Sequence, residues 1–333
     1  MMPTLMRAWI LPAQDGIGAL QLMDIADPVA RPGEVVLKVQ FAALNPADRY
    51  LAEKMYPAHP PMPHVLGRDG IGEVVAIGAG VTGLRVGDKR AVLRGATGVS
   101  RHGTFAEFVA VSADSIIETP RGWSDEQAAG AALVYLTAWQ ALTQWEDLPP
   151  SSVVLVTGAS GGVGVASVQL GVAMGHTVLA LSRSAQKGEQ LKRLGAAAVF
   201  DPTNHGWGVE LLALLKDRRV DLAIDNIGGT LLPQVIDTLG QRGRASIVGR
   251  LAGAVPQFNS ASLIFRRLRL GGVAVGTYGA VDGQAAWQQI VATLAKRDDR
   301  PLIDHVFPFE QLPAAFDRLA GGPMGKVLLA GPR

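Results

Sequence analysis

Apolar, β-branched segments alternate with amphipathic ones through the middle of the chain. The alternation predicts strands at residues 153–157, 177–181, 197–200, 220–224 and 245–248, and helices that run to 174, over 185–194, over 209–216 and from 231 onward. Strand–helix alternation sustained over about 100 residues is typical of a doubly wound parallel sheet, in which each helix crosses back to the next strand. The pattern therefore predicts an α/β domain in residues 126–276.

Residues 1–125 have a different pattern, in which short apolar segments are separated by turns rich in Pro and Gly. These segments lie at residues 35–39, 72–77 and 105–111. Short strands with turns at such spacing are typical of an all-β sandwich or barrel. The last strand, at residues 325–330, is expected to return to this domain, so that residues 277–333 complete it.

Two further helices are predicted. Residues 124–143 are rich in alanine, and Ser124 is a suitable N-cap with acidic residues directly after it. Residues 285–296 have an amphipathic helical pattern.

The turn after the first predicted strand of the α/β domain carries the spacing G-x-x-G-x-x-G. Glycines let the backbone approach a pyrophosphate closely, and the following helix directs its free N–H groups and positive dipole end at the phosphates. The residues predicted to bind a dinucleotide here are Gly158, Ser160, Gly161, Gly162, Val163 and Gly164.

A hydrolase is the rival interpretation of the same turn. Residues 158–162 also fit the nucleophile elbow G-x-S-x-G, and Asp225 and His305 follow Ser160 in the order of a catalytic triad. Against it, an elbow has no need of the third glycine at Gly164, and a hydrolase would place several strands before its elbow. The dinucleotide interpretation is therefore preferred.

The end of the second strand of this domain indicates which dinucleotide is used. Domains specific for NAD place Asp or Glu there to accept hydrogen bonds from the ribose hydroxyls. Here the strand is followed by Ser182, Arg183 and Ser184. An arginine pairs well with a 2′-phosphate and the serines can donate hydroxyls to it. The sequence therefore predicts NADPH (NADP+).

Composition narrows the remaining possibilities. The chain has 333 residues, a net charge of +2 and no cysteine. The small charge indicates no bulk attraction to nucleic acid or membranes, and the missing cysteines exclude disulfides, thiolate zinc sites and cysteine nucleophiles. No signal peptide or membrane-length apolar run is evident, so a cytoplasmic protein is expected.

Several motifs, in order, resemble the medium-chain dehydrogenase/reductase superfamily over essentially the full length, and within it the zinc-independent quinone oxidoreductase and zeta-crystallin branch. These motifs are Leu44-Asn45-Pro46-Ala47-Asp48-Arg49-Tyr50, Gly67-Arg68-Asp69-Gly70, Val86-Gly87-Asp88, Leu136-Thr137-Ala138-Trp139, the glycine turn and Gly325-Lys326-Val327. The resemblance implies a GroES-like β domain beside a Rossmann domain, with the active site in the cleft between them.

The resemblance also implies that no metal is bound. Where the zinc-dependent relatives carry a catalytic cysteine, this chain has Asn45; their Gly-His-Glu motif is Gly67-Arg68-Asp69 here, and their later cysteine falls near Leu133. The lobe that carries four zinc-binding cysteines in those relatives is missing, and the six histidines form no pair with the sequence spacing of zinc ligands.

The resemblance assigns roles to individual residues. Asn45, Tyr56 and Tyr50 match polar residues around the nicotinamide and substrate, where Asn45 would fix the ribose or the substrate oxygen and Tyr56, or else Tyr50, would donate a proton or hydrogen bond. Other residues match cofactor contacts: Thr137, Lys187, Asn226, Gly249 and, at the pyrophosphate, Lys326. The family's tyrosine beside Lys187 is Pro202 here. Asp69 is expected to form an ion pair with Arg68 or Arg90, with a proton relay as the alternative role.

An NADPH-dependent reductase of quinones or α,β-unsaturated carbonyls is the expected function. Two alternatives stay open: an enoyl-thioester reductase of the same family, and a cofactor-binding, crystallin-like protein with little turnover. A homodimer is expected through an edge strand at residues 268–275. The arginines at 266, 267 and 269 are expected to form a solvated or subunit-facing rim rather than a nucleic-acid site.

Overall fold

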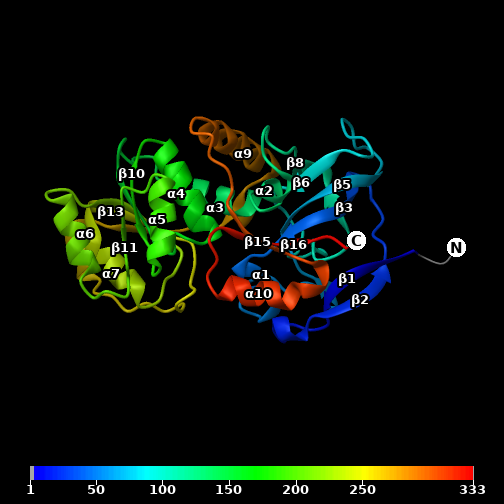
Figure 1. The fold of residues 1–333 in the computed structure, drawn as a ribbon, viewed down its shortest axis with the longest axis horizontal. Coiled ribbons are helices and arrows are strands. Elements are labelled where there is room, and N and C mark those ends of the chain that lie inside the picture. Colours follow the sequence, from blue (N-terminus) through cyan, green and yellow to red (C-terminus); the bar gives the residue numbers. More distant parts are fainter. Residues whose placement is uncertain (1–3, 333) are drawn as a thin grey trace. The chain divides into compact units, whose positions relative to one another are not determined.

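The computed structural model describes residues 4–332, which form two compact units. The first unit contains the chain up to residue 133 together with 278–287 and the chain from residue 300 onward. The second contains residues 134–277 and 288–299. Both units are drawn in Figure 1. Within residues 4–332, no helix is both long and apolar enough to cross a membrane.

The second unit is built on a six-stranded sheet in which every pairing is parallel. In spatial order its strands are β11 (Ala198–Phe200), β10 (Thr177–Leu181), β9 (Val153–Val156), β12 (Val220–Asp225), β13 (Leu239–Ile247) and β14 (Arg269–Gly272). This is the 3-2-1-4-5-6 order of a Rossmann fold, which confirms the predicted doubly wound sheet. The order of the strands reverses between β9 and β12, so the carboxyl ends of these two strands mark the topological switch point of the sheet.

Helices cover this sheet. They are α3 (Ala132–Thr143), α4 (Gly162–Ala173), α5 (Ala185–Arg193), α6 (Trp207–Leu215), α7 (Leu231–Thr238) and α8 (Ala261–Arg266). All four residues of β9 are buried, as expected for a strand with both faces covered. Helix α4 packs closely on β10 because it is rich in small residues; a Cβ on Gly171 would lie 2.9 Å from Val178.

The first unit contains antiparallel β-structure, as predicted for a GroES-like domain. Its larger sheet has the order β15 (Ile303–Phe307), β16 (Lys326–Ala330), β3 (Glu34–Ala43), β5 (Asp69–Ile77), β6 (Lys89–Val92) and β8 (Ile116–Ile117), and β7 (Phe108–Ser112) pairs with β3. A smaller sheet joins β2 (Gln21–Ala26), β1 (Leu5–Leu11) and β4 (His64–Val65). The final strand therefore does return to the N-terminal region.

The core of the first unit forms around aromatic side chains from distant parts of the sequence. The rings of Phe105 and Phe316 meet edge to face with centroids 6.0 Å apart. The indole of Trp9 donates to the Phe309 carbonyl at 2.8 Å. These contacts attach α10 (Leu312–Ala320) and the short 3₁₀ turn before it to the small sheet, because a buried indole N–H must find an acceptor.

Some helices differ from the prediction. The helix predicted at 124–143 is two helices, α2 (Asp125–Ala129) and α3, because the chain breaks at Gly130. Ser124 is the N-cap, as predicted, and accepts from the Gln127 amide at 3.2 Å. Helix α9 (Ala280–Ala295) begins five residues earlier than predicted, and α1 (Pro46–Ala52) and α10 were not predicted.

Two histidines far apart in the sequence lie together in the first unit. The rings of His64 and His102 are 5.5 Å apart, although their spacing in the sequence resembles no ligand pair. His64 is 1% exposed, and its Nε2 has no hydrogen-bond partner within residues 4–332. Burial, followed by the nearby His102 and Arg68, lowers the pKa of His64 to about 4, and burial lowers the pKa of His102.

These histidines predict a loss of stability in acid. An unfolded chain takes up a proton on His64 near pH 6.5, whereas the folded chain resists it until about pH 4. The free energy of unfolding should therefore fall as the pH drops between these values, by roughly 3 kcal/mol from His64 alone at about 1.4 kcal/mol per pKa unit. Urea unfolding of the wild type and His64→Gln between pH 4 and 7.5 measures this.

The variant should lose that part of the pH dependence, whereas His59→Gln, at an exposed histidine, should keep it. Parallel curves for wild type and His64→Gln would contradict the prediction. The comparison with the wild type removes the contribution of Asp48, whose titration runs in the opposite direction because its pKa is raised.

Candidate functional site

A buried polar cluster lies where β3 ends and α1 begins. Asn45 precedes the helix in an extended conformation, with Pro46 in the first helical position. The backbone amide of Asn45 donates to Oδ2 of Asp48 at 2.8 Å. This bond closes the first turn of α1. The local sequence therefore fixes the backbone of Asn45 and directs its side chain into the unit.

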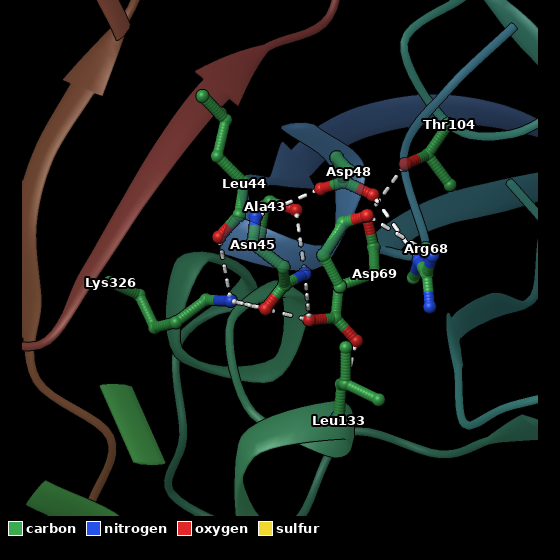
Figure 2. Close-up of polar contacts among 10 residues, drawn as sticks. Ala43, Leu44, Asn45, Asp48, Arg68, Asp69, Thr104, Leu133 and Lys326 are labelled. Atoms are coloured by element: carbon green, nitrogen blue, oxygen red, sulfur yellow. Dashed lines mark hydrogen bonds and ion pairs between the residues drawn. The ribbon is translucent and has the colours of Figure 1, made fainter. Parts of the chain in front are cut away.

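The Asn45 side chain uses both of its donor hydrogens inside the protein. Its Nδ2 donates to Oδ2 of Asp69 at 3.0 Å and to the Ala43 carbonyl at 3.3 Å. Its Oδ1 accepts from Nζ of Lys326 at 2.7 Å. The orientation of the side-chain amide is therefore defined: its oxygen points toward the ammonium of Lys326 and its nitrogen toward the carboxylate of Asp69 (Figure 2).

Lys326, the first residue of β16, completes the cluster. Besides Asn45, its ammonium donates to the Leu44 carbonyl at 3.0 Å and to Oδ2 of Asp69 at 3.3 Å. Lys326 is 4% exposed and Asp69 is 1% exposed. The sequence predicts Lys326 at the cofactor pyrophosphate, and that role stays a prediction; its contacts inside the first unit were not anticipated.

The prediction that Asp69 pairs with Arg68 or Arg90 is wrong. Asp69 pairs with Lys326, whereas Arg68 lies 3.4 Å from Asp48 and Arg90 lies 3.1 Å from Asp88. The backbone amide of Leu133 donates to the other carboxylate oxygen of Asp69 at 3.2 Å. Asp69 therefore accepts on both oxygens.

Arg68 connects the cluster to a tyrosine. Its guanidinium lies over the ring of Tyr56, 4.1 Å from the ring centroid, and donates to the Ala47 carbonyl at 3.3 Å. Asp48 is fully buried, and burial raises its pKa to about 6 although the Arg68 charge opposes this. The stacked guanidinium fixes the orientation of the half-buried Tyr56 ring. Tyr50 lies on α1, also half-buried.

Of the residues predicted for catalysis, the structure thus joins Asn45 directly to Lys326 and places Tyr56 against Arg68. Three members of this cluster, Asp48, Arg68 and Asp69, were not predicted as site residues. The signal for Asp48 was present, because Asn at an N-cap, Pro next and an acid three residues after the cap form a helix start.

The glycine turn in the second unit has the geometry that a dinucleotide needs. Gly158 has φ +55°, and a Cβ there would lie 2.8 Å from Ile227. A Cβ on Gly164 would lie 2.3 Å from the Gly158 carbonyl oxygen, so no side chain fits. Helix α4 then begins at Gly162, and the amides of its first turn have no partner within the helix. Ser160, Gly161 and Val163 are half-buried in this turn.

The neighbouring strand end adds a polar residue with an unused acceptor. Asn226, directly after β12, donates from Nδ2 to the Thr157 carbonyl at 2.8 Å, while its buried Oδ1 has no partner among the described residues. A Cβ on Gly249 would lie 2.3 Å from the Asn226 carbonyl oxygen. An acceptor buried in this way fits a hydrogen-bond donor of a bound molecule, at the strand ends where Rossmann folds bind ligands.

Asp225 cannot serve as the acid of a hydrolase triad. Its Oδ1 accepts from the Thr157 hydroxyl at 2.7 Å and from the Ile227 amide at 3.2 Å, and its Oδ2 accepts from the Gly228 amide at 3.0 Å. The carboxylate is completely buried and is occupied in shaping the turn after β12. The hydrolase interpretation of Ser160 therefore loses its second member.

The end of β10 presents the residues predicted to select NADPH. The Ser184 hydroxyl caps α5 by accepting from the Lys187 amide at 3.4 Å, and Ser182 exchanges hydrogen bonds of 3.3 Å with the Ser184 backbone. Arg183 is exposed. A carboxylate does lie nearby: hydrogen bonds from Thr203, and then the Arg183 charge, lower the pKa of Asp201.

Thr137 is a buried residue of α3. As for a metal, no group of three or more His, Asp or Glu side chains in residues 4–332 is arranged to hold one.

Comparison with known proteins identifies the family. Residues 31–121 match the alcohol dehydrogenase GroES-like domain and residues 162–296 match the zinc-binding dehydrogenase family. The chain is 30% identical to the synaptic vesicle membrane protein VAT-1 homolog of Rattus norvegicus, over 93% of this chain and 80% of that protein. It is 28% identical to a quinone oxidoreductase of Lama guanicoe, over 98% and 97% of the two chains.

Among solved structures, an NAD-dependent alcohol dehydrogenase superimposes with a TM-score of 0.90 at 28% identity, over 98% of this chain and 99% of the other. The fold of both units, the glycine turn and the sequence relatives therefore all indicate the same superfamily. The chain belongs to the medium-chain dehydrogenase/reductase superfamily, in its zinc-independent branch.

Proposed function

We propose that the protein is a zinc-independent, NADPH-dependent reductase of quinones or α,β-unsaturated carbonyls. Membership of the superfamily supports oxidoreductase activity. The observation that carries the finer proposal is the buried cluster of Asn45, Asp69 and Lys326, whose chemistry suits a carbonyl acceptor and not a metal-bound alcohol. When bound, the nicotinamide supplies the hydride.

The residues of the cluster favour a conjugated acceptor. Oxidation of an alcohol requires its hydroxyl to lose a proton, which a Lewis acid makes possible near neutral pH. The cluster offers an amide, carboxylates, an ammonium and a guanidinium instead. In a quinone or enone the negative charge that follows hydride transfer spreads onto an oxygen, which hydrogen-bond donors and cations stabilise. Tyr56, held by Arg68, is the proposed donor.

The hydrogen bonds of Asn45 limit what it can bind. Both of its Nδ2 hydrogens are used by Asp69 and Ala43, and one lone pair of Oδ1 is used by Lys326. What remains is an acceptor, because an amide oxygen accepts two hydrogen bonds. Of the two roles expected from the sequence, Asn45 therefore suits a ribose hydroxyl, which donates, better than a carbonyl oxygen, which does not.

Turnover with a panel of acceptors tests the proposal. NADPH oxidation is followed with quinones, enals, enones and enoyl thioesters, and the expected result is turnover with at least one conjugated class and none with saturated alcohols and NADP+. Tight NADPH binding without turnover on any acceptor would instead support a crystallin-like protein.

Removing the Tyr56 hydroxyl should slow the reduction. Tyr56→Phe keeps the ring on which Arg68 lies, so the fold is retained while the donor is lost. We expect kcat to fall by roughly ten- to a thousand-fold if the hydroxyl stabilises the oxyanion. Tyr50→Phe is the matched change at the other candidate tyrosine and should have the smaller effect. Unchanged kcat in Tyr56→Phe would assign that residue to packing.

Arg183 should set the preference for NADPH. It is exposed at the end of β10, and a charge-assisted hydrogen bond to the 2′-phosphate contributes roughly 1.5–3 kcal/mol. Arg183→Ala should therefore weaken NADPH by about ten- to a hundred-fold and leave NADH nearly unchanged. Arg193→Ala, at an exposed arginine near the other end of α5, is the control. Equal use of both cofactors by the wild type would contradict the assignment, as would an equal loss of both in Arg183→Ala.

We also propose that the protein forms a homodimer through β14. This strand is at the edge of the six-stranded sheet, and unpaired edges favour association. Apolar side chains are exposed just before it, with Ile264 and Phe265 69% and 78% exposed. Light scattering should give twice the mass of the chain, and Leu270→Lys should shift the protein toward monomer. A wild type that stays monomeric across a range of concentrations would refute the dimer.

A further inference from the structure

The cluster at Asn45 does not fit the metal that the family's name implies. Residues 162–296 match a family described as zinc-binding, and zinc requires three or four Cys, His or carboxylate ligands. Of the positions that the family resemblance matches to zinc ligands, only Asp69 carries such a group; the others are Asn45, Arg68 and Leu133. These positions do converge in space, through the bonds from Asn45 and from the Leu133 amide to Asp69.

An ammonium lies among them. Nζ of Lys326 is 2.7 Å from Oδ1 of Asn45 and 3.3 Å from Oδ2 of Asp69 (Figure 2). We propose that the Lys326 ammonium takes the cationic position of this site, as a positioning residue that orients Asn45 and Asp69 and supplies a fixed positive charge during reduction. This inference rests on the proposed reductase function.

The hydrogen bonds of the ammonium make its charge fixed. An ammonium has three donors, and Lys326 has three acceptors, at Leu44, Asn45 and Asp69. With every donor engaged, Lys326 acts by its charge and by holding its partners, and not as a proton donor. Because Oδ1 of Asn45 faces this charge, the side-chain amide cannot flip without placing its NH₂ group against the ammonium.

The backbone prepares the position of the lysine stem. Gly325 has φ +90°, and a Cβ there would lie 2.2 Å from the Leu302 carbonyl oxygen, so that only glycine lets the chain enter β16 in this way. A Cβ on Gly130 would lie 3.2 Å from Cβ and Cγ of Lys326. The stem therefore lies against the backbone at the break between α2 and α3, where a larger residue would push it away.

Stability alone does not account for the cluster. Two cations, Arg68 and Lys326, lie with two carboxylates, Asp48 and Asp69, in the interior of the unit. Desolvating such charges offsets most of their attraction, and apolar replacements are often as stable. In a low-dielectric interior, however, a charge acts strongly on a neighbouring reaction, which is what a reduction that develops an oxyanion can use.

Lys326→Met tests the proposal because it keeps the length of the stem and removes the charge. We expect kcat with a quinone at saturating NADPH to fall roughly ten- to a hundred-fold, while the dissociation constant of NADPH, measured by fluorescence, stays within about three-fold. Lys89→Met removes an ion pair with Asp125 elsewhere in the first unit and should leave both unchanged.

Two outcomes would overturn the inference. Unchanged kcat in Lys326→Met would show that the charge has no part in turnover, and a loss confined to NADPH affinity would assign Lys326 to the cofactor phosphates instead. Zinc titration of the wild type adds a third: stoichiometric binding on which turnover depends would show that the position accepts a metal.

A stability measurement keeps the inference separate from the proposed function. Lys326→Met leaves Asp69 with an unpaired buried charge, whereas adding Asp69→Asn removes it. In urea unfolding, the double variant should therefore lose less stability than the sum of the two single losses, by roughly ten-fold in the equilibrium constant. If the wild type reduces no acceptor, the proposed function fails; additive effects would then overturn the placement of the ammonium as well, and coupling would support it.

Discussion

A charged ammonium in a protein interior has to be surrounded by acceptors, and this constraint organises the first unit. Lys326 lies 281 residues from Asn45 and 257 residues from Asp69 along the chain. Their contact requires β16, the end of β3 and the start of β5 to meet. Strand register does this, since Ala43 pairs with both Leu328 and Asp69. A shift of register in either pairing would leave a charge buried without a partner, so the polar cluster and the sheet specify each other.

How much of the fold could be predicted from the sequence depends on the distance along the chain between the residues that interact. The Rossmann sheet and its glycine turn were predicted because their signals are local: apolar strands, amphipathic helices and a turn within a few residues. The contact between Lys326 and Asn45 was not, because no local pattern records which strands become neighbours. Asp69 shows the error this causes. Its sequence neighbour Arg68 was the expected partner, but Arg68 lies at a bend just before β5 and contacts Asp48 and Tyr56 instead.

Other differences have equally specific causes. The break between α2 and α3 falls at Gly130. The sequence predicts one alanine-rich helix through this residue, because a single glycine is tolerated within helices. Helix α1 is only seven residues long, too short to show a helical period, although its start was marked by Asn45, Pro46 and Asp48. The pairing of His64 with His102 joins β4 to a loop, and a contact of that kind leaves no trace in sequence spacing.

The third glycine of the turn after β9 has a consequence for genetics. Gly164 is excluded from substitution by the backbone of Gly158 and Ala159, which its Cβ would approach to 2.3 and 2.5 Å. The residue thus faces its own turn rather than open space. An allele that replaces it would abolish the protein by preventing α4 from docking on β9, and its phenotype would look like loss of cofactor use. For variants in this motif, the amount of folded protein in the cell therefore distinguishes a failure to fold from a failure to bind the cofactor.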